Sequence, residues 1–340
     1  SNPVPQGYNL LGFAFSYPKV YPLFKETPMF LAPHSRRVVI GLVVTAFVVG
    51  LIGFSAPSAS AQEGGPRTIT DFMGNQVTIQ NPPQHVIGMS ASINEMLFAI
   101  GVTPAGVTDA MDYPPAAASL PTFGSGYQPD LEALAALSPD LIIADGQLNM
   151  SIMDKLGAIA PTFAVMTLTA SDIPKNIQLL GQATWHDTQA DYVSKAYDDF
   201  LALADALGQA SQGPSILIIV GTLDQPNYGK SSTYLGDMAK RLGATNIADG
   251  EADQGPFPGY TQLSSEAILA ADPQVILTVT RGSDTPIPDT MKTDPVWSTL
   301  SAVKSGKVYE MDSRLFLESP GPRFVDAMLQ LYQLLYGEGM

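Results

Sequence analysis

Short apolar runs alternate with segments of helical periodicity along most of the chain. Strands that alternate with helices in this way predict a largely parallel sheet covered on both faces. A small hairpin with Gly74 in its loop is expected before this pattern begins, from residues 68–70 and 77–79. The runs of strand length are residues 86–89, 102–107, 141–144, 215–221 and 275–280. The segments with helical spacing are residues 92–100, 131–137, 234–242, 264–271 and 324–335.

One longer helix, predicted over residues 188–210, separates two such alternating regions. The chain is also too long for a usual single core once about 60 N-terminal residues are set aside. We therefore predict an α/β protein of two Rossmann-like lobes joined by a single long interdomain helix, with a ligand cleft between the lobes. The expected parts are an N-terminal lobe (62–187), the linker helix (188–212) and a C-terminal lobe (213–340).

A phrase in the first region recurs in the second, 134 residues later. "DLEALAALSPDLIIA" is echoed by "SSEAILAADPQVILT", so that Glu132 corresponds to Glu266 and Pro139 to Pro273. Two copies are too few for a solenoid but fit two pseudo-symmetric lobes. Each glutamate lies in the first turn of a predicted helix. There it either complements the helix dipole or, as one of a matched pair, docks an arginine of a partner.

The N-terminal residues have the features of an export signal. Arg36 and Arg37 precede an uncharged, largely apolar run over residues 38–56, and Ala59-Ser60-Ala61 has the form of a signal-peptidase site. We expect a translated leader (1–28) before Met29, a signal peptide (29–61), and cleavage near Ala61. The alternative is that the apolar run is retained as a membrane anchor.

Composition excludes several classes of partner. Residues 62–340 hold 13 Lys and Arg against 31 Asp and Glu, a net charge of −18, which repels nucleic acid and anionic lipid. The chain has no cysteine, which excludes disulfides, thiolate metal sites and a lipid-modified N-terminal cysteine. An exported product is therefore expected to be a periplasmic protein, not a lipoprotein. No cofactor and no dedicated metal site are expected.

Two segments of the sequence have partial likeness to catalytic motifs. Gly229-Lys230-Ser231 is similar to the end of a phosphate-binding loop, but Asp224 stands where its first glycine belongs, and an acid there opposes a triphosphate. This segment is better explained as a strand-to-helix loop at the cleft mouth. A secreted hydrolase would need His85 or His186 in the cleft, and "GMSAS" lacks the last glycine of a nucleophile elbow.

Loops that follow predicted strands provide the ligand-binding candidates, because open α/β sheets bind ligands there. Aromatic rings supply stacking area and guanidinium groups supply paired donors. This mixture predicts a large, flat or aromatic, partly anionic ligand. The candidates are Tyr113, Tyr127, Tyr228, Tyr260, Arg281, Arg314 and Phe316, with Asp112 and Phe257 in the same loops.

Over residues 67–336 the chain resembles the ABC-transporter substrate-binding proteins for ferric siderophores, haem and cobalamin. The resemblance rests on the order and spacing of "TDFMGNQVTI", "DLEALAALSPDLIIA", "YGKSSTYLGDMAKRLGATNIA", "LSSEAILAADPQVIL" and "WSTLSAVKSGKVYEMD". It implies two lobes on one stiff interdomain helix, with one glutamate per lobe docking to the two permease subunits. Glu132 and Glu266 occupy those positions.

The resemblance also implies a non-enzymatic, monomeric receptor that delivers a small-molecule metal chelate to an ABC permease dimer. Cobalamin-binding members share "DYPP", here residues 112–115, but carry tryptophans near the positions of Gly126 and Leu315, which this chain lacks. Haem-binding members use a Tyr or His axial ligand, for which Tyr113, Tyr127 or Tyr228 are available. Arginines with aromatics favour a ferric siderophore, followed by haem and then cobalamin. A secreted hydrolase-type enzyme is the alternative of another class.

Overall fold

The structure is a computed structural model that describes residues 65–255 and 257–337. The expected leader (1–28) and signal peptide (29–61) lie outside these ranges. Within them, no helix has both the length and the apolar character needed to cross a bilayer.

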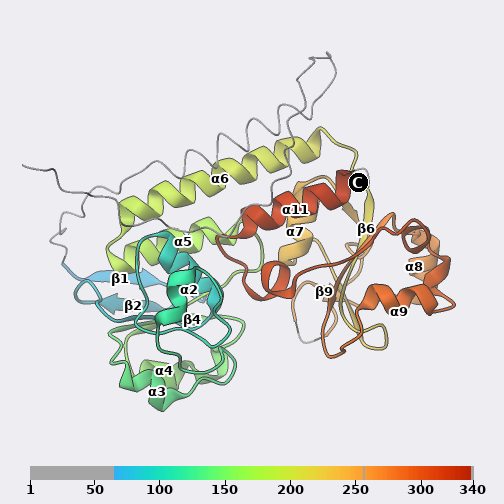
Figure 1. Cartoon of the computed structure of the whole chain (residues 1–340). Coiled ribbons are helices and arrows are strands. Elements are labelled where there is room, and N and C mark those ends of the chain that lie inside the picture. Colours follow the sequence, from blue (N-terminus) through green and yellow to red (C-terminus); the bar gives the residue numbers. More distant parts are fainter. Residues whose placement is uncertain (1–64, 256, 338–340) are drawn as a thin grey trace, which may run out of the picture. The chain divides into compact units, whose positions relative to one another are not determined.

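The N-terminal elements are a hairpin followed by a small parallel sheet (Figure 1). Strands β1 (Arg67–Thr70) and β2 (Gln76–Ile79) pair antiparallel, which confirms the predicted hairpin. The sheet has the order β3 (Val86–Gly88), β4 (Leu141–Asp145), β5 (Thr162–Val165), with both pairs parallel. The first four side chains of β4 are fully buried, as expected for a strand covered on both faces. The accompanying helices are α2 (Ala91–Ala99), α3 (Leu131–Ala136), α4 (Met153–Gly157) and α5 (Asp172–Thr184).

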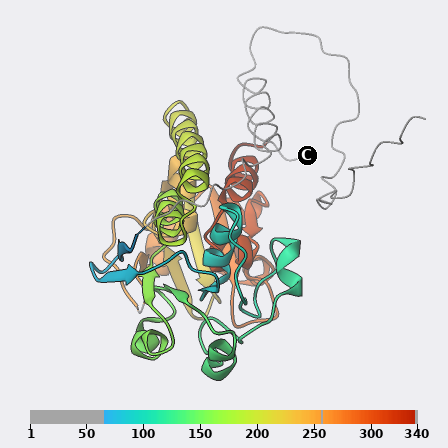
Figure 2. The same ribbon diagram turned by 90° about the vertical axis from the view of Figure 1, so that its left-hand side faces the viewer.

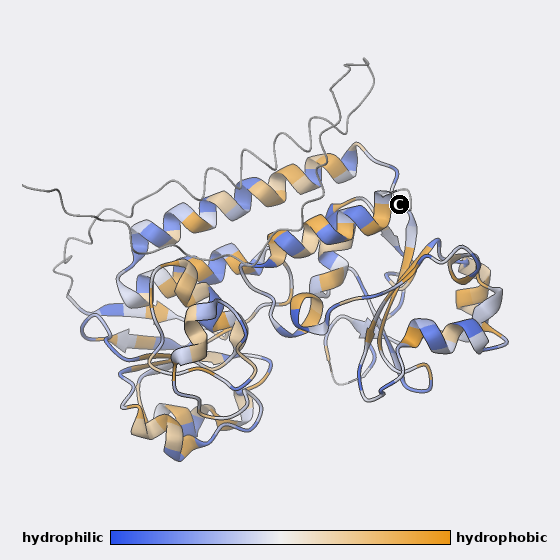
Figure 3. Cartoon of the chain, viewed as in Figure 1, coloured by the Kyte–Doolittle hydropathy of each residue, from blue (hydrophilic) through white to orange (hydrophobic). Residues whose placement is uncertain are grey.

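The C-terminal sheet is larger and mixed. Its order is β11 (Val308–Glu310), β10 (Val275–Thr280), β6 (Ser215–Gly221), β7 (Pro226–Gly229), β9 (Tyr260–Thr261), and β8 (Thr245–Asn246) pairs with the start of β6. Strands β6, β8, β10 and β11 are parallel, and β7 runs antiparallel to β6 and β9. Two of these strands, β6 and β10, are mostly hydrophobic (Figure 3). The helices of this region are α7 (Tyr234–Arg241), α8 (Ser265–Ala271), α9 (Ile287–Thr293), α10 (Ser301–Lys304) and α11 (Phe324–Tyr336).

The long helix α6 (Asp187–Gln209) lies between the two sheets in the sequence and packs against helices of both regions (Figures 1 and 2). Its contacts include α5 on one side and α7 on the other. Phe324 of α11 meets two of its rings edge-on, with centroids 5.0 Å from Tyr197 and 5.7 Å from Phe200. The helix is present as predicted, and its role as the single link between two domains stays a prediction.

Arg241 joins three of these helices through ion pairs and hydrogen bonds. Its Nη1 donates to Asp205 of α6 (2.8 Å to Oδ2), and its Nε donates to Asp237 one turn earlier (3.0 Å). Its Nη2 donates to Ser171 Oγ, beside the first residue of α5. Asp237 also accepts from the Ala170 amide (3.0 Å). Because this one guanidinium has partners on α5, α6 and α7, it fixes their mutual orientation.

A close backbone approach brings the last turn of α6 against the end of α7. A Cβ on Gly208 would overlap the carbonyl oxygen of Arg241, and a Cβ on Gly243 would lie 2.6 Å from the oxygen of Gly208. Gly243 also has φ 93°, a conformation that disfavours other residues. The two glycines therefore form a seam that has no room for side chains.

Two sequence predictions about the strands are wrong. Residues 102–107 form only isolated bridges, Ile87 with Gly106 and Val107 with Thr122, because Pro104 supplies no amide donor for a ladder. The segment after β6 is not a simple strand-to-helix loop, since β7 turns back and pairs with β6 before α7 begins.

Candidate functional site

The repeated phrase forms the same structural unit twice, as α3 followed by β4 and as α8 followed by β10. Asp130 caps α3 by accepting from the Glu132 and Ala133 amides, each at 3.0 Å, and Ser264 caps α8 by accepting from the Ala267 amide at 3.1 Å. After each helix one residue takes a left-handed conformation, Ser138 with φ 51° and Asp272 with φ 40°. The two units therefore begin and end by the same local geometry.

In each unit the glutamate is exposed and an apolar residue of the same helix is buried. Leu134 and Ile268, two residues after the glutamates, have 0% and 2% of their surface exposed, whereas Glu132 and Glu266 are exposed. The carboxylates therefore project from rigidly packed helices. Two such charges on one frame suit a partner that offers two cations at a fixed separation.

The predicted arginines lie where parallel strands of the C-terminal sheet end. The Arg281 amide, directly after β10, donates to the Gly221 oxygen at the end of β6 (2.9 Å). Arg314 begins a short π-helical turn (Arg314–Glu318) that follows β11. The carboxyl ends of these strands thus bring the two side chains to one edge of the sheet.

Each arginine is already paired with a carboxylate. Arg281 pairs with Glu318. Arg314 Nη1 donates to Asp112 Oδ2 of the N-terminal region (2.7 Å), whose other oxygen accepts from Arg323 Nη2 (3.2 Å). The Glu318 charge also acts on Arg314, so these residues and Glu95 form a charge chain from Arg281 to Glu95.

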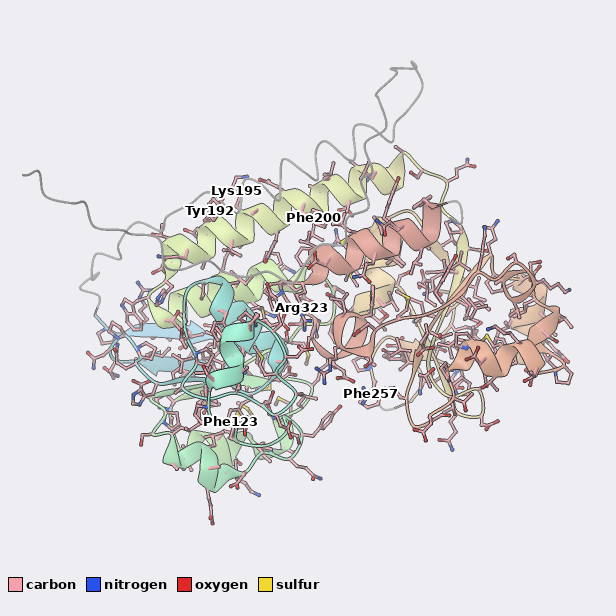
Figure 4. All side chains as sticks on the ribbon, viewed as in Figure 1. Phe123, Tyr192, Lys195, Phe200, Phe257 and Arg323 are labelled. Carbon is pink, nitrogen blue, oxygen red and sulfur yellow. The ribbon has the colours of Figure 1, made fainter. Side chains whose placement is uncertain are left out.

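Arg323, at the start of α11, extends the charge chain into the N-terminal region (Figure 4). Its Nη2 donates to Glu95 Oε1 at 2.6 Å, and its Nε donates to both Glu95 oxygens at 3.1 Å. Its guanidinium lies 5.2 Å from the centre of the Tyr113 ring, a cation–π distance. Ser92 Oγ reinforces the same junction by donating to the Pro320 oxygen (2.7 Å).

At the inner end of the charge chain, burial has the largest effect on the pKa of Glu95. The Glu95 side chain is fully buried, and burial raises its pKa from 4.5 to about 7 although Arg323 acts in the opposite direction. Burial lowers the pKa of Arg323, but Glu95 and Asp112 outweigh this and raise it. At the exposed end, the Asp112 hydrogen bond and charge raise the pKa of Arg314.

The aromatic candidates divide by exposure. Tyr127 is 65% exposed and Phe257 is 52% exposed, and Phe257 lies between the N-terminal elements and the C-terminal sheet in Figure 4. Tyr113 and Tyr260 are half-buried. Tyr228 and Phe316 are 3% and 2% exposed; burial raises the pKa of Tyr228 to about 12. Of the candidates, the structure offers Tyr127 and Phe257 most openly to a ligand and encloses Tyr228 and Phe316.

A buried amide supports the loop that carries Tyr127. Asn149 is fully buried; its Oδ1 accepts from the Asp145 amide at 2.8 Å, and its Nδ2 donates to the Gly126 oxygen at 2.8 Å. Asp145 ends β4, and burial raises its pKa. Asn149 therefore holds the residue before Tyr127 against the end of the sheet. Asn149, Arg323 and Glu95 are not among the residues predicted for the site. The sequence signals for two of them are an acid within the apolar face of a helix (Glu95) and an arginine at the end of "DSRLFLESPGPR" (Arg323).

The groups considered for catalysis have structural partners. Nδ1 of His85 lies 3.1 Å from the Ser138 oxygen, and Nδ1 of His186 lies 2.7 Å from the Thr184 oxygen. Lys230 Nζ donates to Asp253 (2.7 Å), which also accepts from the Gly259 amide. In the part of the chain that the structure describes, no three His, Cys, Asp or Glu side chains are grouped to hold a metal ion.

Comparison with known proteins agrees with this geometry. The family described as "Periplasmic binding protein" matches residues 86–315. The Fe(3+)-citrate-binding protein YfmC of Bacillus subtilis is 26% identical over 291 residues, covering 75% of this chain and 81% of that protein. A cobalamin-binding protein of Halobacterium salinarum is 26% identical over 311 residues, covering 85% and 82%.

A solved structure supports the fold. The petrobactin-binding protein YclQ of Bacillus subtilis superposes with a TM-score of 0.70 at 17% identity, covering 81% of this chain and all of that one. At this identity the likeness concerns the fold alone. It confirms the predicted two-lobed α/β architecture.

Proposed function

Since the chain belongs to the periplasmic binding protein family, we propose that it is a receptor that captures a metal chelate outside the cytoplasm and delivers it to an ABC importer. The observation that carries this proposal is the pair of matched units, α3–β4 and α8–β10, each presenting one exposed glutamate. The two glutamates lie on helices that lead into different sheets, and such a matched pair suits a receptor that docks to two permease subunits.

The ligand-binding site in this proposal is the edge where the parallel strands end. Tyr127 and Phe257 provide exposed ring surface, and Arg281, Arg314 and Tyr113 lie along the charge chain. A ferric siderophore remains the favoured ligand, and relatives named for Fe(3+)-citrate support an iron chelate. Haem and cobalamin are the alternatives; relatives named for cobalamin and a structure titled with heme support keeping them.

A periplasmic location and a monomeric state complete the proposal. Relatives include a protein named periplasmic and others named lipoproteins. Because this chain contains no cysteine, it lacks the residue on which a lipoprotein anchor is built. We therefore propose a freely diffusing receptor, released from its export signal near Ala61.

Charge reversal at the two glutamates tests the proposal. Glu132→Arg combined with Glu266→Arg should abolish chelate uptake by cells while leaving the affinity of the purified protein for the chelate nearly unchanged. Asp191→Arg combined with Asp198→Arg, two exposed positions on α6, makes the same change in net charge and should leave uptake intact. Normal uptake by the glutamate double variant would refute docking through these residues.

A further inference from the structure

The charge chain has no spare positive charge to offer a ligand. Its three arginines, Arg281, Arg314 and Arg323, face three carboxylates, Glu318, Asp112 and Glu95. Asp312 adds a further negative charge near Arg314 and accepts from its backbone amide (2.9 Å). The two arginines that suggest an anionic ligand in the sequence, Arg281 and Arg314, are thus neutralised by carboxylates of the protein itself.

The two exposed arginines are the ones that an anion would have to recruit. The side chains of Arg281 and Arg314 are 49% and 51% exposed, and those of their partners Glu318 and Asp112 are 37% and 33% exposed. An anionic chelate that took either arginine would displace a carboxylate and leave it beside the new anion. Like charges brought together in a partly dry site are unfavourable.

The rest of the protein adds to this repulsion. A net charge of −18 over residues 62–340 produces a negative potential that opposes the approach of anions. Stacking on the exposed rings of Tyr127 and Phe257, by contrast, requires no charge on the ligand and is strengthened by a positive one.

We propose that the ligand of this receptor is an uncharged or cationic metal chelate, selected against polyanionic chelates by the paired carboxylates Asp112 and Glu318. This inference rests on the proposed function, because it assigns a charge class to the chelate that the receptor would carry. Asp112 and Glu318 act as built-in competitors for the two arginines. Carboxylates on the ligand would therefore not increase its affinity.

Three ferric complexes of different charge test the inference. The purified protein is titrated calorimetrically with ferric desferrioxamine B (cationic), ferrichrome (uncharged) and ferric citrate (anionic). One of the first two should bind at least about tenfold more tightly than ferric citrate. The difference should shrink as salt is raised, because screening weakens the repulsion.

Removing the competitors should relax the selection. Glu318→Gln frees Arg281, and its combination with Asp112→Asn also frees Arg314; each of the two variants should raise the affinity for ferric citrate about tenfold. Asp289→Asn, which removes one carboxylate from a solvent-exposed pair with Lys292 on α9, is the matched control and should change it little. Glu318→Gln alone leaves the Asp112 junction intact, so a folding defect of the double variant, checked by circular dichroism, does not prevent the test.

The possible results distinguish failure of the proposed charge class from failure of the receptor function. Tighter binding of ferric citrate than of the other complexes by the unaltered protein would overturn the charge class and leave the receptor function standing. An equal gain in Asp289→Asn would overturn the role of Asp112 and Glu318, since overall charge would then explain it. If the protein bound none of the three complexes, and bound neither haem nor cobalamin when titrated in the same way, the receptor function would be overturned and this inference with it.

Discussion

Arg323 and Glu95, 228 residues apart in the chain, are joined by three hydrogen bonds, the shortest of them 2.6 Å. The pair connects the residue that directly precedes α11 to the buried face of α2. Breaking one partner of such a pair leaves a buried charge without compensation. At this junction Arg323 favours the ionised form of Glu95 whereas burial, the larger effect, favours the neutral form.

We predict that Glu95 makes stability depend on pH between 4.5 and about 7, the ordinary and folded values of its pKa. In this window the folded state holds more protons than the unfolded state, so the contribution of Glu95 falls as pH rises, by up to about 3 kcal/mol. Glu95→Gln should remove this contribution. Urea unfolding of both proteins across the window measures it, with exposed Glu251→Gln as the control for loss of one carboxylate. Parallel stability curves for Glu95→Gln and the unaltered protein would contradict the prediction.

Tyr127→Ala should weaken chelate binding without altering the fold. The ring is 65% exposed, so its removal costs little stability, whereas loss of a stacking surface for a ligand costs about 1–2 kcal/mol of affinity. Calorimetric titration with the tightest-binding ferric complex, together with the melting temperature, measures the two effects. Tyr192→Ala on α6, where the ring is 49% exposed, is the control. Equal affinities for the two variants would exclude Tyr127 from the site.

Gly208→Ala should destabilise the protein although alanine is the better helix former. The added methyl group would overlap the Arg241 carbonyl, and forcing apart two backbones costs about 1–3 kcal/mol. Gly157→Ala, where a Cβ meets nothing within 4 Å, should change stability by less than about 1 kcal/mol. Chemical unfolding compares the two. A stabilised Gly208→Ala protein would show that the seam can open.

Arg241→Met should be markedly more harmful than loss of a surface cation. The change leaves Asp237, 14% exposed, and Asp205 without their shared partner, for an expected loss of about 2 kcal/mol or more in unfolding free energy. Lys195→Met, which removes a cation from an exposed pair with Asp199 on α6, should cost about 0.5 kcal/mol or less. Similar losses in the two variants would mean that Arg241 does not tie the helices together.

Much of the fold follows from local pattern. The strand at 215–221 was predicted with the bounds that the structure shows, and the hairpin, α3, α6 and α11 lie within two residues of their predicted ends. Apolar runs and helical spacing are local properties of the sequence, so they predict helices and strands without knowledge of tertiary contacts. The missed strand β7 is decided by long-range pairing: it is a strand because β6 and β9 lie on either side of it, and this is not visible in its own sequence.

The candidate site was less predictable for the same reason. Arg314 was found as a residue type in a suitable loop, but its partner Asp112 is 202 residues away. Burial of Tyr228 likewise depends on strand pairing and not on its neighbours in sequence. The repeated phrase was informative because each copy contains both the residue that caps its helix and the left-handed residue that follows the helix. The helix could therefore be predicted without any distant contact.

The seam of Gly208 and Gly243 also has a genetic consequence. Any single-nucleotide change in the first two positions of a glycine codon replaces the residue or stops the chain, and every replacement adds the side chain that this contact excludes. Variation should therefore be purged at these two positions, which lie away from the proposed ligand and docking surfaces. Among natural variants of this gene, changes here should be rarer than changes at the exposed tyrosine that we assign to the ligand.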